Sequence, residues 1–410
     1  MSTFETMLDR YAELAVKIGI NIQPGQTLVV NSPLSAAEFI RKVARKAYEA
    51  GAKHVHIEWN DDELTRIRYE LAPDEAFREF PLWKAKGFEE MAENGAAFLS
   101  ISTSNPYLLK GIAPERLATA NRTAGQAMQK FRNYTMSDMV SWSIVGVPSE
   151  TWAALVFPDM PREEQIPALW NAIFKANRCD LDDPIQAWRE HHATLAQKVT
   201  YLNNEKYRVL HYEAPGTKLS IELPEGHIWI GGGGKNSKGV QFMANMPTEE
   251  VFTAPKKDGV NGVVRSTKPL NYQGNLIENF SLTFEQGRIV DFSAETGADV
   301  LERLIGMDEG SHYLGEVALV PHESPISLSN LIFYNTLFDE NASNHLAIGK
   351  AYPTCLEGGT SMGPEELAKH GLNESLTHVD FMIGSAEMNI DGETAEGTRE
   401  PLFRNGNWAI

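Results

Sequence analysis

The sequence predicts an α/β N-terminal domain with an open, mostly parallel sheet, followed by an α+β, mainly antiparallel C-terminal domain. The chain has 410 residues, which is more than one hydrophobic core usually holds. Its first part alternates short apolar strands with amphipathic helices, whereas closely spaced strands dominate after about residue 206. The predicted boundaries are therefore 1–185 for the α/β domain, 186–205 for a helical connector and 206–410 for the second domain.

The first 180 residues follow the order of elements that a doubly wound sheet requires. A strand at 27–31 precedes a helix at 35–50, whose apolar residues form one stripe and which ends at Gly51, and a strand follows at 54–59. Strand, helix and strand at this spacing predict a βαβ unit with parallel strands. The alternation continues with a helix ending at 89–94, a strand at 97–102, a helix at 114–131 and a strand at 142–147.

The connector and the second domain show different patterns. Helices are predicted at 166–178 and 183–202, the second of which begins at a proline. The strands predicted beyond them are 207–212, 219–223, 262–266, 282–284 and 289–294, with a hairpin turn over 284–289. Two further helices are predicted at 298–305 and 327–338.

Charge, cysteine content and hydropathy restrict the class of protein. The 55 acidic residues outnumber the 37 basic ones, and this net charge of -18 argues against a nucleic-acid partner. Two distant cysteines, Cys179 and Cys355, provide neither a disulfide framework nor a thiolate zinc site. The amphipathic N-terminus predicts a first helix rather than a signal peptide, and no apolar run is long enough to span a membrane. We therefore expect a cytoplasmic protein without a membrane partner.

Several apparent motifs do not meet the requirements of their chemistry. The glycine run Gly231–Lys235 is followed by Asn236, where a phosphate loop needs serine or threonine, so a flexible connection or a close backbone approach is favoured. His54 and His56 alternate on a predicted strand, so that one of them should face packed helices, and both are expected to be structural histidines. His191 lies in a polar helix and is expected at the surface.

Carboxylates and imidazoles gather in the last part of the chain. His378 and Asp380 alternate on a predicted strand and should project from the same face, and Glu316 begins another apolar strand. A buried carboxylate needs a compensating partner, and a cation is one. Taken one at a time, these residues are more simply explained as caps, turns or helix ends. Together they suit Zn²⁺, Mn²⁺, Co²⁺ or Mg²⁺ in a hydrolytic site, and the candidate ligands are Glu250, Glu316, Glu340, His345, His378 and Asp380.

Four segments resemble the thermophilic-type metallo-aminopeptidase family, which contains aminopeptidases T, S and II. They are residues 245–255, 315–318, 341–352 and 378–384, and the similarity extends over essentially the whole chain. The resemblance implies a homodimeric exopeptidase that acts on short peptides and holds two divalent metal ions per subunit (Zn, Co, Mn or Mg) in the domain 206–410. The positions that match the family's ligands are Glu250, Glu316, His345, His378 and Asp380, with Glu340 as a second-metal carboxylate and Tyr352 as a site tyrosine.

The same resemblance suggests a mechanism. Glu316 would bridge two metals that activate water, Tyr352 would stabilise the oxyanion, and Glu250 or Glu340 would act as the general base. The α/β domain, which has no catalytic constellation, would shape an enclosed cavity or support dimer formation.

The sequence is also compatible with three other functions. One is a metal-dependent hydrolase of another amide or ester, and another is a binding protein with a structural cation. The third, a nucleotide-dependent enzyme, is weakened by the missing glycine fingerprint.

Overall fold

The computed structural model describes residues 3–105, 107–272 and 275–410, which form two compact units. Unit 1 comprises residues 1–190 and 233–247, and unit 2 comprises residues 191–232 and 248–410. The short segment 233–247 thus belongs to the unit formed by the N-terminal part of the chain. The boundaries predicted at residues 185 and 205 stay predictions.

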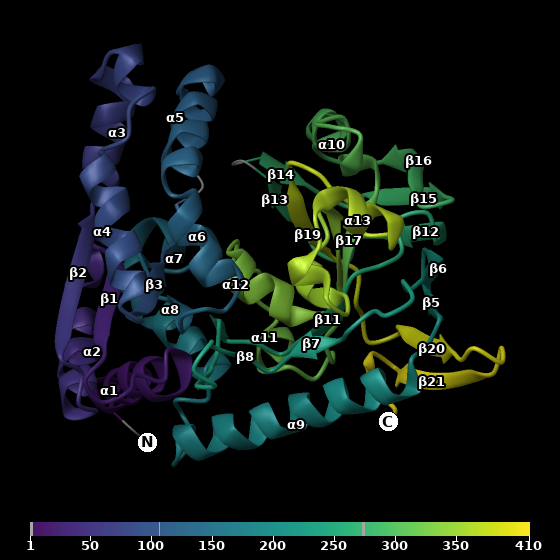
Figure 1. The fold of residues 1–410 in the computed structure, drawn as a ribbon, viewed down its shortest axis with the longest axis horizontal. Helices are drawn as coiled ribbons and strands as arrows, with labels where there is room; N and C mark the ends of the chain where they lie inside the picture. Colours follow the sequence, from purple (N-terminus) through teal and green to yellow (C-terminus); the bar gives the residue numbers. More distant parts are fainter. Residues whose placement is uncertain (1–2, 106, 273–274) are drawn as a thin grey trace. The chain divides into compact units, whose positions relative to one another are not determined.

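Unit 1 is built on a parallel five-stranded sheet with the order β10-β4-β3-β1-β2. Strands β1, β2 and β3 of this sheet are labelled in Figure 1. The strand order reverses direction at β1, as it does in doubly wound folds, so the predicted parallel sheet is confirmed. The sequence did not predict the fifth strand, β10, which comes from a segment about 100 residues after β4. The strands are β1 Thr27–Pro33, β2 His54–Asn60, β3 Ala97–Ser102, β4 Trp142–Gly146 and β10 Asn245–Met246, with a separate small pair β8 Gly234–Lys235 and β9 Gln241–Phe242.

The helices of unit 1 begin where the sequence offers caps. The side chains of Asp61 and Ser149 accept hydrogen bonds from main-chain amides of the first turns of α3 and α7. The predicted helix at 114–131 is instead two helices, α5 and α6, separated at Met128. The helices are α1 Phe4–Leu14, α2 Ala37–Glu49, α3 Asp62–Leu71, α4 Leu82–Glu93, α5 Pro114–Ala127, α6 Gln129–Met136, α7 Glu150–Val156 and α8 Arg162–Ala176, with shorter turns at η1 Ala15–Gly19, η2 Leu34–Ala36 and η3 Asp74–Phe77.

The two histidines of β2 differ from the prediction. His54 and His56 are both exposed, whereas Val55 and Ile57 on the other face of the strand are half-buried. β2 is an edge strand with β1 as its only strand neighbour among the described residues, and its histidine face is open to solvent. The expectation that one of these histidines faces packed helices was therefore wrong.

Unit 2 contains two antiparallel sheets. An eight-stranded sheet has the order β16-β15-β12-β6-β5-β20-β21-β22, and a five-stranded sheet has the order β19-β18-β17-β11-β7. One apolar cluster includes side chains from both sheets, which gives unit 2 a common core. The strands are β5 Val209–Ala214, β6 Thr217–Glu222, β7 Ile230–Gly231, β11 Val251–Thr253, β12 Val260–Arg265, β15 Ser281–Glu285, β16 Arg288–Ser293, β17 Leu314–Leu319, β18 His345–Gly349, β19 His378–Met382, β20 Asn389–Glu393, β21 Arg399–Arg404 and β22 Asn407–Trp408, with a separate pair β13 Leu270–Tyr272 and β14 Asn275–Ile277.

The helix predicted at 327–338 is wrong. Two short helices, α11 and α12, flank an irregular segment in which Asn330 and Tyr334 have φ angles of 54° and 53°. This left-handed conformation cannot continue an α-helix. The remaining helices are α9 Pro184–Glu205, which begins in unit 1 and ends in unit 2, α10 Ala298–Ile305, α11 Pro325–Leu328, α12 Thr336–Asp339 and α13 Pro364–Lys369, with turns η4 Gly310–His312, η5 Glu340–Ala342, η6 Pro353–Cys355 and η7 Gly359–Ser361.

The structure also bears on the expected absence of a membrane-spanning helix and on the state of the two cysteines. Within the described ranges, no helix is both long and apolar enough to cross a membrane. Cys179 and Cys355 are buried free thiols. The absence of a disulfide framework agrees with the sequence.

Candidate metal centre

The five-stranded sheet of unit 2 has two chemically different faces. Alternate residues of its strands, including Val317 on β17, Leu346 on β18 and Phe381 on β19, enter the common apolar core. Because side chains alternate between the faces of a strand, the intervening residues project from the opposite face. These residues are Glu316 and Ala318 on β17, His345, Ala347 and Gly349 on β18, and His378, Asp380 and Met382 on β19.

The strand register brings the polar residues together. Ala347 lies directly between Glu316 and Asp380 on the neighbouring strands, and Gly349 lies opposite His378. Both residues of β18 are small, so the longer side chains on either side can converge above them. Gly349 has a φ of +112°, and a Cβ there would come within 2.2 Å of the carbonyl oxygen of Thr377. Glycine is therefore required at this position.

A β-bulge directs Glu316 onto the polar face. The register between β17 and β18 shifts between Leu314 and Glu316. Leu314 belongs to the apolar core, and without the extra residue it would share a face with Glu316. The bulge is thus the local feature that separates this carboxylate from the core.

Two groups of side chains on this face can each hold a metal ion. Glu250, Glu316 and His345 form one group, and Glu316, His378 and Asp380 form the other, with one potential ligand atom per residue lying within 4.8 Å of the others in its group. Glu316 belongs to both groups. Its Oε1 lies 3.4 Å from His345 Nε2, and its Oε2 lies 3.5 Å from His378 Nε2.

The ring nitrogens of both histidines are oriented by main-chain carbonyls. His378 Nδ1 lies 2.7 Å from the oxygen of Lys350, and His345 Nδ1 lies 3.2 Å from that of Ser343. A carbonyl oxygen only accepts hydrogen bonds, so each Nδ1 carries the hydrogen. When such a ring is neutral, its Nε2 lone pair faces the carboxylates. This is the arrangement that carbonyl groups impose on metal-binding histidines.

Two carboxylate oxygens of the site are left without hydrogen bonds among the described residues. Glu250 Oε2 and Asp380 Oδ1 are buried and accept none. They lie 3.1 Å from His345 Nε2 and 3.4 Å from His378 Nε2, but neither contact has hydrogen-bond geometry. Buried acceptors of this kind are uncommon unless an ion or water satisfies them, so the residues present fit a divalent cation.

The raised pKa values of Glu250 and Glu340 reflect the same excess of negative charge. Burial raises the pKa of the Glu250 carboxyl, and His345 only partly offsets this effect. Burial also raises the pKa of Glu340 well above its usual range, and the charges of Glu250 and Asp380 add to the rise. The site therefore needs protons or a cation to neutralise its carboxylates.

The imidazoles respond to the same charge. Burial opposes protonation of His378, but the carboxylates of Asp380 and Glu316 outweigh it and raise the pKa to about 11. Burial also opposes protonation of His345, whose pKa the carboxylates of Glu250 and Glu316 raise well above its usual range. In the absence of a cation, protons on the imidazoles take its place.

Tyr352 and Glu340 lie at the margins of the two groups. The ring of Tyr352 lies 4.7 Å from that of His378, centroid to centroid, and Tyr352 itself is 36% exposed. Burial raises the pKa of the Tyr352 phenol, and the nearby carboxylates add to the rise, so that it stays protonated. Glu340 is not a member of either ligand group but interacts electrostatically with Glu250 and Asp380.

The sequence missed residues that support the site. Asn341 is fully buried, and its Oδ1 accepts a 2.7 Å hydrogen bond from the main-chain amide of Glu249, directly before Glu250. His191, expected at the surface, is part-buried and lies 2.8 Å from the carbonyl oxygen of Thr248. The alternation of His345, Ala347 and Gly349 could have indicated the site in the sequence. A polar residue followed by two small ones on one strand face leaves room for neighbouring side chains.

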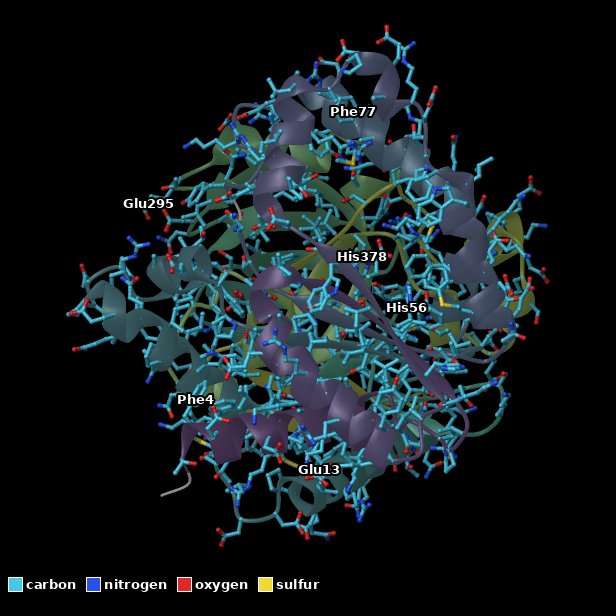
Figure 2. All side chains as sticks on the ribbon, turned by 90° about the vertical axis from the view of Figure 1, so that its left-hand side faces the viewer. Phe4, Glu13, His56, Phe77, Glu295 and His378 are labelled. Atoms are coloured by element: carbon cyan, nitrogen blue, oxygen red, sulfur yellow. The ribbon has the colours of Figure 1, made fainter. Side chains whose placement is uncertain are left out.

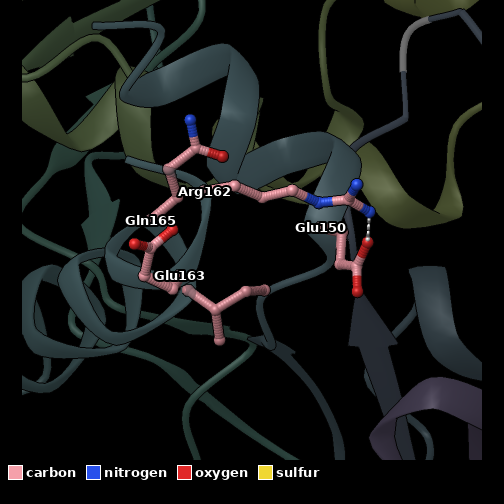
Figure 3. Close-up of a pocket in the computed structure, with 5 residues that line it drawn as sticks. Glu150, Arg162, Glu163 and Gln165 are labelled. Carbon is pink, nitrogen blue, oxygen red and sulfur yellow. Dashed lines mark hydrogen bonds and ion pairs between the residues drawn. The ribbon is translucent and has the colours of Figure 1, made fainter. Parts of the chain in front are cut away.

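Two other features do not provide a comparable site. A surface pocket in unit 1 is lined by Glu150, Arg162, Glu163, Gln165 and Ile166 (Figure 3). Arg162 and Glu150 form an ion pair there, with 2.6 Å between Nη2 and Oε2, and both side chains are exposed to solvent. In the glycine run, a Cβ on Gly231 would lie 2.7 Å from the carbonyl oxygen of Glu250, so the predicted close backbone approach is confirmed.

Comparison with known proteins shows the family to which the chain belongs. The sequence profile of the thermophilic metalloprotease family (M29) matches residues 4–408. Aminopeptidase 2 of Geobacillus stearothermophilus is 60% identical over 410 residues, covering 100% of this chain and 99% of that protein. Aminopeptidase T of Thermus thermophilus is 44% identical, with 100% of both chains covered. The solved structure of wild-type AmpT from Thermus thermophilus matches with a TM-score of 0.93 and 43% identity, again over 100% of both chains.

The similarity therefore covers the complete length of each chain and both units of the fold. It confirms the family resemblance predicted from the sequence, and with it the prediction of a hydrolase of the metallo-aminopeptidase class. The chain belongs to the M29 family of thermophilic metalloproteases.

Proposed function

We propose that this chain is an aminopeptidase that removes the N-terminal residues of short peptides at a centre of two divalent metal ions. The observation that carries the proposal is the position of Glu316, whose two oxygens face different histidines, 3.4 and 3.5 Å away. A carboxylate in this position can bridge two ions. The proposed ligands are Glu250, Glu316, Glu340, His345, His378 and Asp380.

The chemistry follows from the donor atoms. Two divalent ions bound there would activate water and polarise the carbonyl group of the first peptide bond. The phenol of Tyr352, held protonated by its raised pKa, donates a hydrogen bond to the oxygen that becomes negative. Glu250 or Glu340, if its carboxylate is not fully committed to metal, would take a proton from the attacking water and return it to the leaving amine.

The test begins with metal removal. Dialysis against a chelator should abolish activity, and adding Zn²⁺, Co²⁺, Mn²⁺ or Mg²⁺ separately should restore it to different extents. Elemental analysis of the active protein should give two ions per chain. Since the ligands are preformed only in the folded state, metal should also stabilise the protein by roughly 2.7 kcal/mol for each bound ion at a hundredfold excess over its Kd.

A matched set of substrates separates aminopeptidase activity from the hydrolysis of other amides or esters. Leucine p-nitroanilide has a free amine, N-acetyl-leucine p-nitroanilide lacks it, and p-nitrophenyl acetate is an ester. We expect metal-dependent hydrolysis of the first alone. Equal rates on the acetylated compound would contradict an aminopeptidase, and turnover of the ester alone would support the alternative. Metal binding without any turnover would indicate a structural cation.

The assembly and location of the protein are proposals with weaker support. A homodimer is proposed from the family resemblance, and light scattering coupled to size-exclusion chromatography would measure its mass. A cytoplasmic location is proposed from the composition and the N-terminal sequence. A preference for short peptides is proposed as well, so that folded proteins should be cleaved far more slowly than short peptides.

A further inference from the structure

We propose that an apolar ledge formed by Ile230, Phe252 and Met362 receives the side chain of the substrate's N-terminal residue and makes the enzyme prefer large apolar residues there. This inference rests on the proposed aminopeptidase function and names its substrate class. All three residues belong to unit 2.

The ledge begins beside the proposed metal ligands. Phe252 follows Glu250 by two residues and is paired with Ala318 on β17, next to the strand position of Glu316. Its neighbour Val251 enters the common core, so Phe252 projects from the opposite, polar face of the sheet. The ring of Phe252 contacts that of Tyr352 edge to face, with 6.3 Å between the centroids. Tyr352 in turn contacts His378.

Ile230 extends this surface away from the ligands, and Met362 packs on the same small apolar cluster. Ile230 on β7 is the direct cross-strand partner of Phe252. Ile230, Phe252 and Met362 are partly exposed and pack on a small apolar cluster distinct from the common core. The cluster consists of Ala254, Ala351, Cys355, Leu356, Leu367 and Leu372. The cluster fixes the inner side of the ledge and leaves its outer side available for contact.

The chemistry of the ledge defines the preferred substrate. A peptide whose first carbonyl lies at the metal site must place its first side chain within a few ångströms of that site. None of the three ledge side chains carries a charge or a hydrogen-bond donor, so an aliphatic or aromatic side chain gains from contact whereas a charged one loses its hydration. One methylene group in an apolar pocket changes kcat/KM by roughly 10-fold or more. Leucine and phenylalanine should therefore be preferred to alanine and glutamate.

The experiment compares leucine, alanine, glutamate and arginine p-nitroanilides with the metal-loaded enzyme. Ile230→Ala and Met362→Ala should lower the leucine-to-alanine ratio of kcat/KM by roughly 10-fold. Phe252→Leu is the suitable change at the third position, because it keeps apolar volume beside Tyr352. Phe292→Ala is the matched control, since Phe292 is a partly buried residue of β16 that packs on the other core.

The second measurement tests whether a variant gains a preference for a basic N-terminal residue. Met362→Glu places a negative charge on the ledge and should raise the arginine-to-leucine ratio by roughly 10-fold or more. An unchanged ratio in all ledge variants would overturn the inference, and so would a parallel loss on every substrate. If the wild-type protein with metal hydrolysed none of the four substrates, the proposed aminopeptidase function itself would fail, which is a different result from an active enzyme with unaltered preference.

Discussion

Strand β1 of the parallel sheet and strand β18 of the antiparallel sheet are both largely buried, but they use their buried surface differently. In the parallel sheet of unit 1, the consecutive residues Leu28, Val29 and Val30 of β1 are buried, and both faces of the strand are apolar. In the antiparallel sheet of unit 2, every residue of β18 is buried, but His345, Ala347 and Gly349 share one face and Leu346 and Ile348 the other. Burial alone therefore does not distinguish a structural strand from a strand of the site.

The distinction lies in the size and polarity of alternate residues. Carboxylates and imidazoles can share a buried face only if small residues between them leave space and a counter-charge compensates them. Unit 2 meets the first condition with Ala347 and Gly349, and a cation would meet the second.

The largest effect is expected from the carboxylate shared by both ligand groups. Glu316→Gln keeps the shape of the side chain but removes the charge that would bind two cations. We expect kcat/KM to fall by roughly 10³-fold or more, which corresponds to the several kcal/mol that metal ions contribute to such transition states. His56→Gln on the exposed edge strand of unit 1 is the control and should leave both activity and metal content unchanged (Figure 2). A Glu316→Gln protein with two ions and full activity would disprove the bridging role.

An intermediate effect is expected where a small residue separates two ligands. Ala347→Val and Ala97→Val each enlarge a fully buried alanine, the first in β18 and the second in β3. Both should cost about 1–3 kcal/mol of stability in chemical denaturation because they overpack the interior. Only Ala347→Val should also weaken metal binding, by roughly 10–100-fold in calorimetric titration, because it separates Glu316 from Asp380. Equal metal affinity in both variants would show that Ala347 is not a spacer.

The last effect concerns the stability of the metal-free protein at alkaline pH. The pKa of His378 is about 11 in the folded protein and near 6.5 when the histidine is free of its partners. A raised folded-state pKa means that the stabilisation is complete below about pH 6.5 and is lost as the pH rises through 11. Urea unfolding at pH 6, 8 and 10 should therefore show decreasing stability without metal. His378→Asn should remove this part of the slope, and a stability that rises over the same range would contradict the assignment.

Local pattern was sufficient for most elements of the fold. The apolar stripe that predicted a helix at 35–50 is found in α2, and the alternation of His378 and Asp380 correctly placed both side chains on one face. Local pattern failed where a few backbone angles decided the outcome. The helix predicted at 327–338 contains Asn330 and Tyr334 in the left-handed region, although neither is a glycine that would have indicated a break.

The sequence by itself determined the family, the presence of a parallel and an antiparallel part, and the types of side chain available for metal binding. These properties depend on residue identity and on spacings of two to four positions. Only the tertiary structure decided that Glu316 lies between His345 and His378, that Ala347 separates it from Asp380, and that Phe252 contacts Tyr352. These contacts depend on the register of strands that are distant in sequence. A register shift of one residue, as at the bulge before Glu316, moves a side chain from the core to the site.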